Sequence, residues 1–253
     1  MATASFDYSG QVVLVTGGTK GLGRGIAGRF LDAGATVVVC ARKEPESAMP
    51  DGMHFLSVDL TDGDAAWAMV DVVVEQHGRL DVAINNAGGS PATDTTAASP
   101  RFTSKIVTLN LLTAIYVAQR ANHHMQAGDG GSIINIGSVV AHRPAPGTAA
   151  YGAAKAGLYN FTRTVGQEWA PKVRTNFVTV GMVRTETASY TYGDDAAIAR
   201  VESTIPIGRL VLPDDVADTC LFLASDAAAY ITGADINMDG GGDRPTWMDA
   251  VSG

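Results

Sequence analysis

The chain has 253 residues, of which 46% are hydrophobic and 17% are charged, and these numbers predict one compact domain over residues 1–253. The net charge is −8 and Lys and Arg form no run, so the sequence argues against a nucleic acid or an acidic membrane as a partner. The amino terminus lacks a basic, apolar leader, no apolar stretch is long enough to span a membrane, and Cys40 and Cys220 are the only cysteines. We therefore expect a cytoplasmic protein with free thiols.

Short runs rich in β-branched residues predict seven strands. They lie at 11–17, 35–41, 53–59, 80–86, 131–138, 173–180 and 234–240. Segments with helical spacing lie between them, at 21–33, 62–77, 103–127, 151–170 and 214–225. Strands that are apolar on both faces and alternate with helices predict an α/β fold, a doubly wound parallel sheet of seven strands with helices on both faces. Functional residues are expected just after the strands, at their carboxyl ends.

A glycine-rich stretch, TGGTKGLG at 16–23, joins the first strand to the first helix. Gly17, Gly21 and Gly23 permit a tight turn and a close approach of the backbone to a ligand. The helix that follows offers unpaired N–H groups and a partial positive charge to a pyrophosphate. Because the glycines stand between a strand and a helix, they predict a dinucleotide site.

The end of the second strand bears on the choice of nucleotide. A site specific for NAD commonly has an acid there for the ribose 2′-hydroxyl, whereas this strand ends at Ala41, followed by Arg42 and Lys43. Lys20 adds a cation to the same region, so the sequence favours NADP(H) over NAD(H). The alternative is that Arg42 and Lys43 only solvate a loop. Asp59, at the end of the third strand, suits either an adenine-edge acceptor or a helix cap.

Four polar side chains are the candidate catalytic residues. Tyr151 and Lys155 are one helical turn apart, about 5–6 Å between Cβ atoms, where a cation lowers the pKa of a phenol and lets it exchange protons. The alternative is an ordinary amphipathic helix. Ser138 ends the fifth strand, and a loop that returns to the start of the next helix would bring its hydroxyl and that of Tyr151 to one substrate carbonyl. Asn110 lies among apolar residues of a predicted helix, where a buried amide needs a partner.

These motifs together resemble the short-chain dehydrogenase/reductase family over residues 9–242: TGGTKGLG, VDL at 58–60, NNAG at 85–88, Asn110, Ser138 and YGAAK at 151–155. The resemblance implies a Rossmann-type fold and hydride transfer between a nicotinamide and a small-to-medium ketone or secondary alcohol. In that family Tyr151 would be the acid or base, Lys155 would lower its pKa and bind the nicotinamide ribose, Ser138 would hold the substrate oxygen, and Asn110 would support a proton-relay water.

The residues predicted to contact the cofactor are Gly17, Thr19, Lys20, Gly21, Leu22, Gly23, Ala41, Arg42, Asp59, Leu60, Asn86, Ala87, Gly88, Tyr151, Lys155, Gly181, Val183 and Thr185. One departure from the family pattern is Val180, which stands where Pro is usual. Because Val frees a φ angle and restores an N–H group, the loop after the sixth strand is expected to be less preset.

Several features leave alternatives open. His142 and Arg143 lie on the loop between Ser138 and Tyr151, where they would either line the mouth of the substrate pocket or make no contact with substrate. Segment 182–200 is either a lid or a segment that packs immobile on the surface. Trp247 and Met248 either close a neighbouring subunit's pocket or pack on a surface. No cluster has metal-ligand spacing, so no metal is expected.

The resemblance implies a homo-oligomer, a tetramer more often than a dimer, paired through helices 103–127 and 151–170. Two other functions compete with hydride transfer. One is a catalytically silent NAD(P)-binding regulatory protein, against which the intact set of four catalytic candidates argues. The other is an isomerase, epimerase or dehydratase, which usually needs a larger substrate domain.

Overall fold

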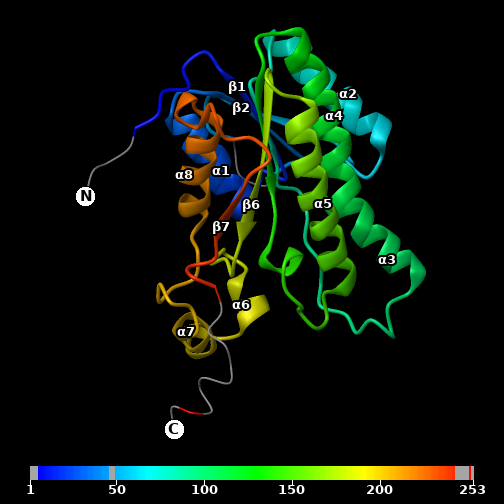
Figure 1. The fold of residues 1–253 in the computed structure, drawn as a ribbon, viewed down its shortest axis with the longest axis vertical. Coiled ribbons are helices and arrows are strands. Elements are labelled where there is room, and N and C mark those ends of the chain that lie inside the picture. Colours follow the sequence, from blue (N-terminus) through cyan, green and yellow to red (C-terminus); the bar gives the residue numbers. More distant parts are fainter. Residues whose placement is uncertain (1–4, 46–48, 243–250, 252–253) are drawn as a thin grey trace.

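The computed structural model describes residues 5–45, 49–242 and 251, and a seven-stranded parallel sheet forms its centre (Figure 1). The strands are β1 (Val12–Thr16), β2 (Thr36–Ala41), β3 (Met53–Ser57), β4 (Val82–Asn85), β5 (Gly131–Ile136), β6 (Val173–Val180) and β7 (Asp235–Met238). Their order in the sheet is β3-β2-β1-β4-β5-β6-β7, and every neighbouring pair is parallel. The predicted α/β fold is confirmed, and the strand order reverses between β1 and β4, which is where such sheets bind ligands.

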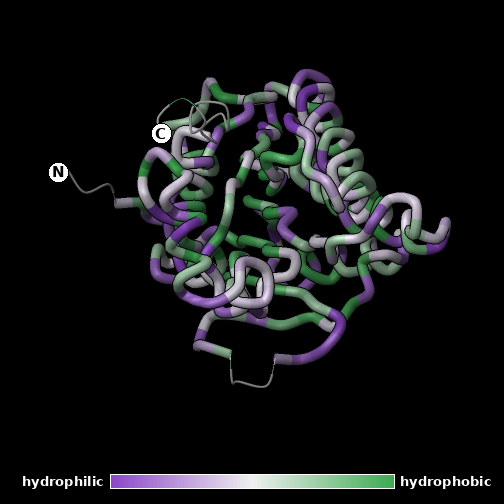
Figure 2. The backbone as a smooth tube through the Cα atoms, turned by 90° about the horizontal axis from the view of Figure 1, so that it is seen from below, coloured by the Kyte–Doolittle hydropathy of each residue, from purple (hydrophilic) through white to green (hydrophobic). Residues whose placement is uncertain are grey.

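Helices cover both faces of the sheet. On one face lie α1 (Gly21–Asp32) and α8 (Pro213–Ala224), and on the other lie α2 (Gly63–His77), α4 (Thr113–Ala127) and α5 (Ala149–Glu168), as Figure 1 shows. Alternate residues of β1 supply both cores: Val13 packs in one core with Phe30 of α1, and Leu14 in the other with Val70 of α2. Figure 2 shows the hydrophobic strands in the middle of the molecule. Burial on both faces explains why the strands are continuous apolar runs.

The predicted helix 103–127 is not continuous. It consists of α3 (Pro100–Val107), a π-helical turn η1 (Thr108–Leu112), and α4. Asn110 lies in the π turn, and its side-chain Nδ2 donates to the carbonyl oxygen of Ile106 at 2.9 Å. In an α-helix that carbonyl would accept the backbone N–H of Asn110, so the side chain competes with the regular ladder. Such turns are frequent at functional sites.

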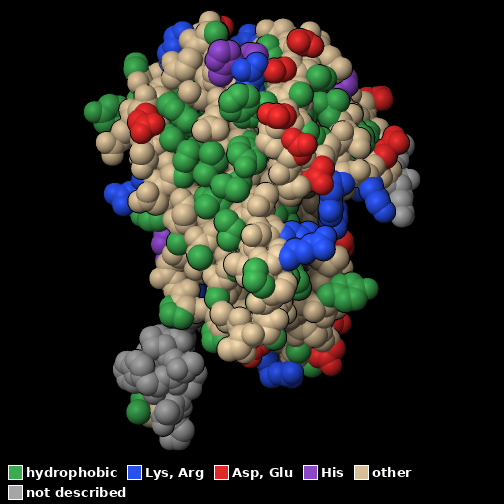
Figure 3. Space-filling view, turned by 90° about the vertical axis from the view of Figure 1, so that its right-hand side faces the viewer, with side chains coloured by type: hydrophobic (Ala, Val, Ile, Leu, Met, Phe, Trp, Pro, Cys, Tyr) green, Lys and Arg blue, Asp and Glu red, His purple; other side chains and the backbone are tan. Residues whose placement is uncertain are grey.

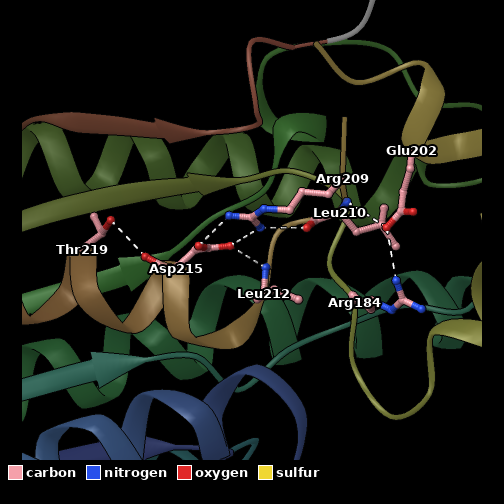
Figure 4. Close-up of polar contacts among 7 residues, drawn as sticks. All are labelled: Arg184, Glu202, Arg209, Leu210, Leu212, Asp215 and Thr219. Carbon is pink, nitrogen blue, oxygen red and sulfur yellow. Dashed lines mark hydrogen bonds and ion pairs between the residues drawn. The ribbon is translucent and has the colours of Figure 1, made fainter. Parts of the chain in front are cut away.

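Segment 182–212, called here the lobe, follows β6 and contains α6 (Ala188–Tyr192) and α7 (Asp195–Ser203). It has its own small core, formed by Ala188, Ile198, Ile205 and Leu210. The Arg209 guanidinium donates to both carboxylate oxygens of Asp215 in α8, at 2.5 and 2.8 Å, and Arg184 pairs with Glu202 at 3.4 Å (Figure 4). The predicted irregular segment with short helix is therefore present, anchored at its carboxyl end to the first turn of α8.

Candidate active site

The glycine turn after β1 is tied to the end of β4. Thr16 Oγ1 accepts the backbone N–H groups of Asn86 and Ala87, both at 3.0 Å, and Asn86 Nδ2 donates to the Thr16 carbonyl at 2.9 Å. Gly17 has φ +65° and a Cβ on Gly23 would lie 2.4 Å from Asn86 Nδ2, so both positions require glycine. The two strand ends on either side of the reversal point therefore form one rigid edge.

A cleft of about 450 Å³ opens along this edge. Thirteen of the predicted cofactor residues line it: Gly17, Lys20, Gly21, Leu22, Gly23, Ala41, Arg42, Asp59, Leu60, Asn86, Ala87, Gly88 and Thr185. Gly21 and Gly23 at the start of α1 have no side chains, so a ligand can approach the helix N–H groups closely. The size of the cleft, its glycine lining and the helix N-terminus fit a dinucleotide.

Cations gather at one end of the cleft. Lys20 and Arg42 line it, and both also line an open depression next to it together with Thr19, Arg24, Lys43 and one acidic residue, Glu44. Asp59 also lines the cleft, and its pKa is lowered, first by hydrogen bonds from Thr61 and to a smaller extent by Arg42 and Lys105. Asp62, not Asp59, caps α2, by accepting from the N–H groups of Asp64 and Ala65. The structure thus does not support the interpretation of Asp59 as a helix cap.

Sequence reasoning missed several residues of the cleft, namely Cys40, Val58, Thr61, Lys105, Leu109, Glu186 and Thr187. Lys105 reaches the cleft from α3, five residues before Asn110, and no local pattern marks it. Glu186 comes from the lobe, and its Oε1 accepts the N–H of Gly21, the first residue of α1, at 2.9 Å. Only tertiary structure brings these two charges to the cleft.

The four catalytic candidates come from three places: Asn110 from the π turn η1, Ser138 from the carboxyl end of β5, and Tyr151 and Lys155 from α5. Lys155 is buried on α5, and its Nζ donates to the Ile136 carbonyl at 2.7 Å and lies 5.8 Å from the Tyr151 ring centroid. Asn110 Oδ1 accepts the Gly89 N–H at 2.7 Å. A Cβ on Gly88 would lie 2.6 Å from Asn110 Oδ1 and 3.6 Å from Lys155 Nζ, so these side chains converge on one bare glycine.

Ser138 follows β5 and begins the turn η2 (Val139–Ala141), which leads towards Tyr151. Its side chain lies close enough to Tyr151 to lower the pKa of the phenol. Burial acts more strongly in the opposite direction, and the net pKa of Tyr151 is raised above its usual value. The prediction from the sequence that Lys155 lowers the pKa of Tyr151 is therefore wrong for the protein without a bound cofactor or substrate. Burial also lowers the pKa of Lys155 to about 8, which weakens that side chain as a fixed cation.

The remaining predicted residues lie apart from the cleft. Val183 donates its N–H to the Tyr192 hydroxyl at 3.2 Å. Gly181 lines a separate pocket of about 240 Å³ with His142 and Arg143. Val180 is the last residue of β6 and pairs with Met238 of β7, so the strand continues to the position where Pro is usual. Trp247 and Met248 lie outside the described residues.

Among residues 5–45, 49–242 and 251, no group of three or more His, Cys, Asp or Glu side chains is placed to hold a metal ion. Over the same ranges, no helix is both long enough and apolar enough to cross a membrane.

Comparison with known proteins agrees with this geometry. A family model described as enoyl-(acyl carrier protein) reductase matches residues 17–243. The chain is 32% identical over 249 residues to 2-dehydro-3-deoxy-D-gluconate 5-dehydrogenase of Escherichia coli, covering 95% of this chain and 98% of that protein.

Two solved structures are also similar. The aldohexose dehydrogenase of Thermoplasma acidophilum matches with a TM-score of 0.88 and 30% identity, over 94% of this chain and 96% of that one. A short-chain type dehydrogenase/reductase from Mycobacterium ulcerans matches with a TM-score of 0.84 and 30% identity, over 94% and 90%. With the parallel sheet and the glycine-lined cleft, these matches show that the chain belongs to the short-chain dehydrogenase/reductase family of oxidoreductases, which bind a nicotinamide cofactor.

Proposed function

We propose that the protein transfers a hydride between NADP(H) and a small-to-medium ketone or secondary alcohol. The observation that carries the proposal is the convergence of Lys155 and Asn110 on Gly88, with Tyr151 over the Lys155 amine, at the edge where the cleft opens. A protein that only bound the nucleotide would not need a buried amine beside a phenol. The substrate classes named for the relatives, a sugar acid and an aldohexose, fit a polar carbonyl substrate.

The four catalytic candidates have separable roles in this proposal. Ser138 holds the substrate oxygen by a hydrogen bond, and Tyr151 donates a proton to that oxygen in reduction and accepts it back in oxidation. The Lys155 ammonium stabilises the phenolate that remains after the proton has left. Asn110 fixes the backbone at Gly89 and so shapes the wall next to Lys155. The nicotinamide, when bound, supplies or accepts the hydride.

A substitution at Tyr151 tests this proposal. Tyr151→Phe is expected to abolish NADPH oxidation with a panel of ketones and aldehydes while NADPH binding, followed by fluorescence, is unchanged. Tyr190→Phe is the matched control, because that ring is exposed on the lobe. Turnover retained by Tyr151→Phe would refute the role of the phenol. A wild-type chain that binds NADPH but reduces nothing would favour the silent nucleotide-binding protein instead.

The preference for NADP(H) is supported by Lys20 and Arg42, which line both the cleft and the open depression beside it. A guanidinium or ammonium bonded to a phosphate contributes about 1.5–3 kcal/mol. Replacing both residues by Gln is expected to raise the KM for NADPH at least tenfold more than the KM for NADH. An equal effect on the two constants would contradict the preference.

We also propose a cytoplasmic homo-oligomer, a tetramer rather than a dimer. Hydrophobic side chains gather in the centre of the molecular face on the side of α2, α4 and α5 (Figure 3). An apolar area of this kind on a protein surface is typical of an interface. Light scattering at micromolar concentration tests the proposal, and a monomeric mass would contradict it.

A further inference from the structure

Three side chains outside the catalytic set form a closed cluster, called here the His142 clamp. His142 Nε2 lies 2.9 Å from Asp235 Oδ2 and 3.0 Å from Thr179 Oγ1, and Thr179 Oγ1 donates to Asp235 Oδ1 at 2.7 Å. Thr179 is fully buried and Asp235 is largely buried. The clamp joins β6 and β7 to the loop that connects Ser138 with Tyr151.

The hydrogen-bond pattern identifies the protonated nitrogen of His142. The Thr179 hydroxyl has a single proton and donates it to Asp235, so towards His142 it can only accept. Asp235, as a carboxylate, also only accepts. Nε2 must therefore carry a proton, whether the ring is neutral or charged, and that proton is shared between the two oxygens.

A single rigid turn links the clamp to Ser138. Ser138 begins η2 and His142 ends it, with the Ala141 N–H donating to the Ser138 carbonyl at 2.9 Å and the His142 N–H to the Val139 carbonyl at 3.1 Å. A turn closed at both ends by these bonds moves as a unit. Displacement of His142 therefore displaces Ser138.

The same turn rests on the helix that carries Tyr151 and Lys155. A Cβ on Gly152 would lie 3.1 Å from the Val140 carbonyl oxygen, so the start of α5 contacts η2 directly. The His142 ring packs edge-to-face on Tyr159, one turn beyond Lys155, with 4.7 Å between centroids. His142 thus contacts both the strands beneath the turn and the helix beside it.

We propose that His142 is a positioning residue, whose Nε2–H bonds to Thr179 and Asp235 hold η2 so that the Ser138 hydroxyl stays in register with Tyr151. The proposal rests on the proposed function, since it concerns the geometry of the same reaction. His142 does not line the cofactor cleft. Losing the clamp is therefore expected to affect the chemical step and to leave NADPH binding unchanged.

Two pairs of variants test the proposal. His142→Ala removes the donor, whereas His142→Gln keeps an N–H group near the position of Nε2. Thr179→Val removes the bridging hydroxyl at nearly constant volume, whereas Thr179→Ser keeps it. The exposed His123 provides a matched control, His123→Ala. The readouts are kcat and KM for the best carbonyl substrate, the Kd of NADPH, and hydrogen exchange of peptides covering 137–143.

His142→Ala and Thr179→Val are expected to lower kcat by on the order of tenfold, since small misplacements of a catalytic group are costly, with the Kd of NADPH within about twofold of wild type. His142→Gln and Thr179→Ser are expected to keep most of the wild-type kcat. Hydrogen exchange of the peptides covering 137–143 is expected to become faster only in His142→Ala and Thr179→Val. An unchanged kcat in His142→Ala, or a parallel loss of kcat and NADPH affinity that Gln does not rescue, would overturn the proposal.

Failure of the proposed function looks different. It gives a wild-type chain that binds NADPH and reduces no carbonyl. Hydrogen exchange still tests the His142 clamp in that case, because it needs no substrate. An unchanged rate of hydrogen exchange at 137–143 in His142→Ala would overturn the positioning role of His142.

Discussion

Glu186 occupies the place to which the proposed cofactor would bring its pyrophosphate, and its removal is expected to tighten NADPH binding. Glu186 Oε1 accepts the Gly21 N–H at 2.9 Å, and Lys20, the residue before α1, forms no side-chain cap. Glu186 is thus an anion at the N-terminus of a helix whose first turn lines the cleft. The Gly21 N–H can donate fully to only one of two anions, so Glu186 would have to release it before a phosphate of the proposed cofactor could accept it.

The size of the effect follows from the strength of this contact. Glu186 is exposed, and an exposed carboxylate at a helix N-terminus contributes about 0.3–1 kcal/mol. If the bonded state is favoured by about 0.5–1 kcal/mol, only about a third to a sixth of the molecules are ready to bind. The apparent Kd equals the intrinsic Kd divided by that fraction, so Glu186→Ala is expected to bind NADPH about three- to sixfold more tightly.

Fluorescence titration with NADPH measures this difference. Glu75→Ala is the matched control, because it removes the same charge from an exposed position on α2. The advantage of Glu186→Ala is expected to shrink at high salt, since the contact is exposed and electrostatic. Equal or weaker binding by Glu186→Ala would refute the reasoning, and so would an equal gain in Glu75→Ala, which would point to net charge alone.

Three further predictions concern stability and are measured by urea unfolding. Gly23→Ala is expected to lower the free energy of unfolding by about 1–3 kcal/mol, because its Cβ would lie 2.4 Å from Asn86 Nδ2. Hydrogen bonds from Arg120 and then from His124 lower the pKa of Asp71 in the folded protein. The ionised carboxylate therefore stabilises the fold above the unfolded pKa of about 3.9, and this stabilisation is lost as the pH falls through the folded pKa. In Asp71→Asn the free energy of unfolding is expected to lose this dependence on acid pH. Burial lowers the pKa of Lys155 to about 8, whereas in the unfolded chain it is about 10.4. Between these two pH values the unfolded chain binds more protons than the folded protein, so the free energy of unfolding is expected to rise with pH. Lys155→Met is expected to lack this rise.

The strands and the glycine turn could be predicted because their causes are local. A strand buried on both faces must be apolar throughout, as in TVVVCA of β2, and a turn with positive φ needs glycine, as at Gly17. The break in the predicted helix 103–127 could not be predicted. It depends on the bonds of Asn110 to Gly89 and Ile106, and Gly89 lies 21 residues away in the chain.

The charges in the cleft divide in the same way. Lys20 and Arg42 stand next to the strand ends that form the cleft, so the order of strands and helices is enough to place them there. Lys105 and Glu186 arrive from α3 and from the lobe, and their positions depend on how those segments pack against the sheet. The cluster of His142, Thr179 and Asp235 likewise joins residues up to 93 positions apart, which no spacing rule relates.

The Tyr151–Lys155 pair shows why spacing alone predicts the wrong sign for a pKa. The spacing puts an amine beside a phenol, but burial acts on both groups, raising the pKa of Tyr151 and lowering that of Lys155 to about 8. Both shifts leave the pair as phenol and ammonium at neutral pH. In the proposed reaction that is the state that reduces a carbonyl, because the phenol has a proton to give and the ammonium, 5.8 Å from the ring centroid, can stabilise the phenolate that forms. Oxidation must start from a deprotonated phenol, so the same burial should favour it only at higher pH.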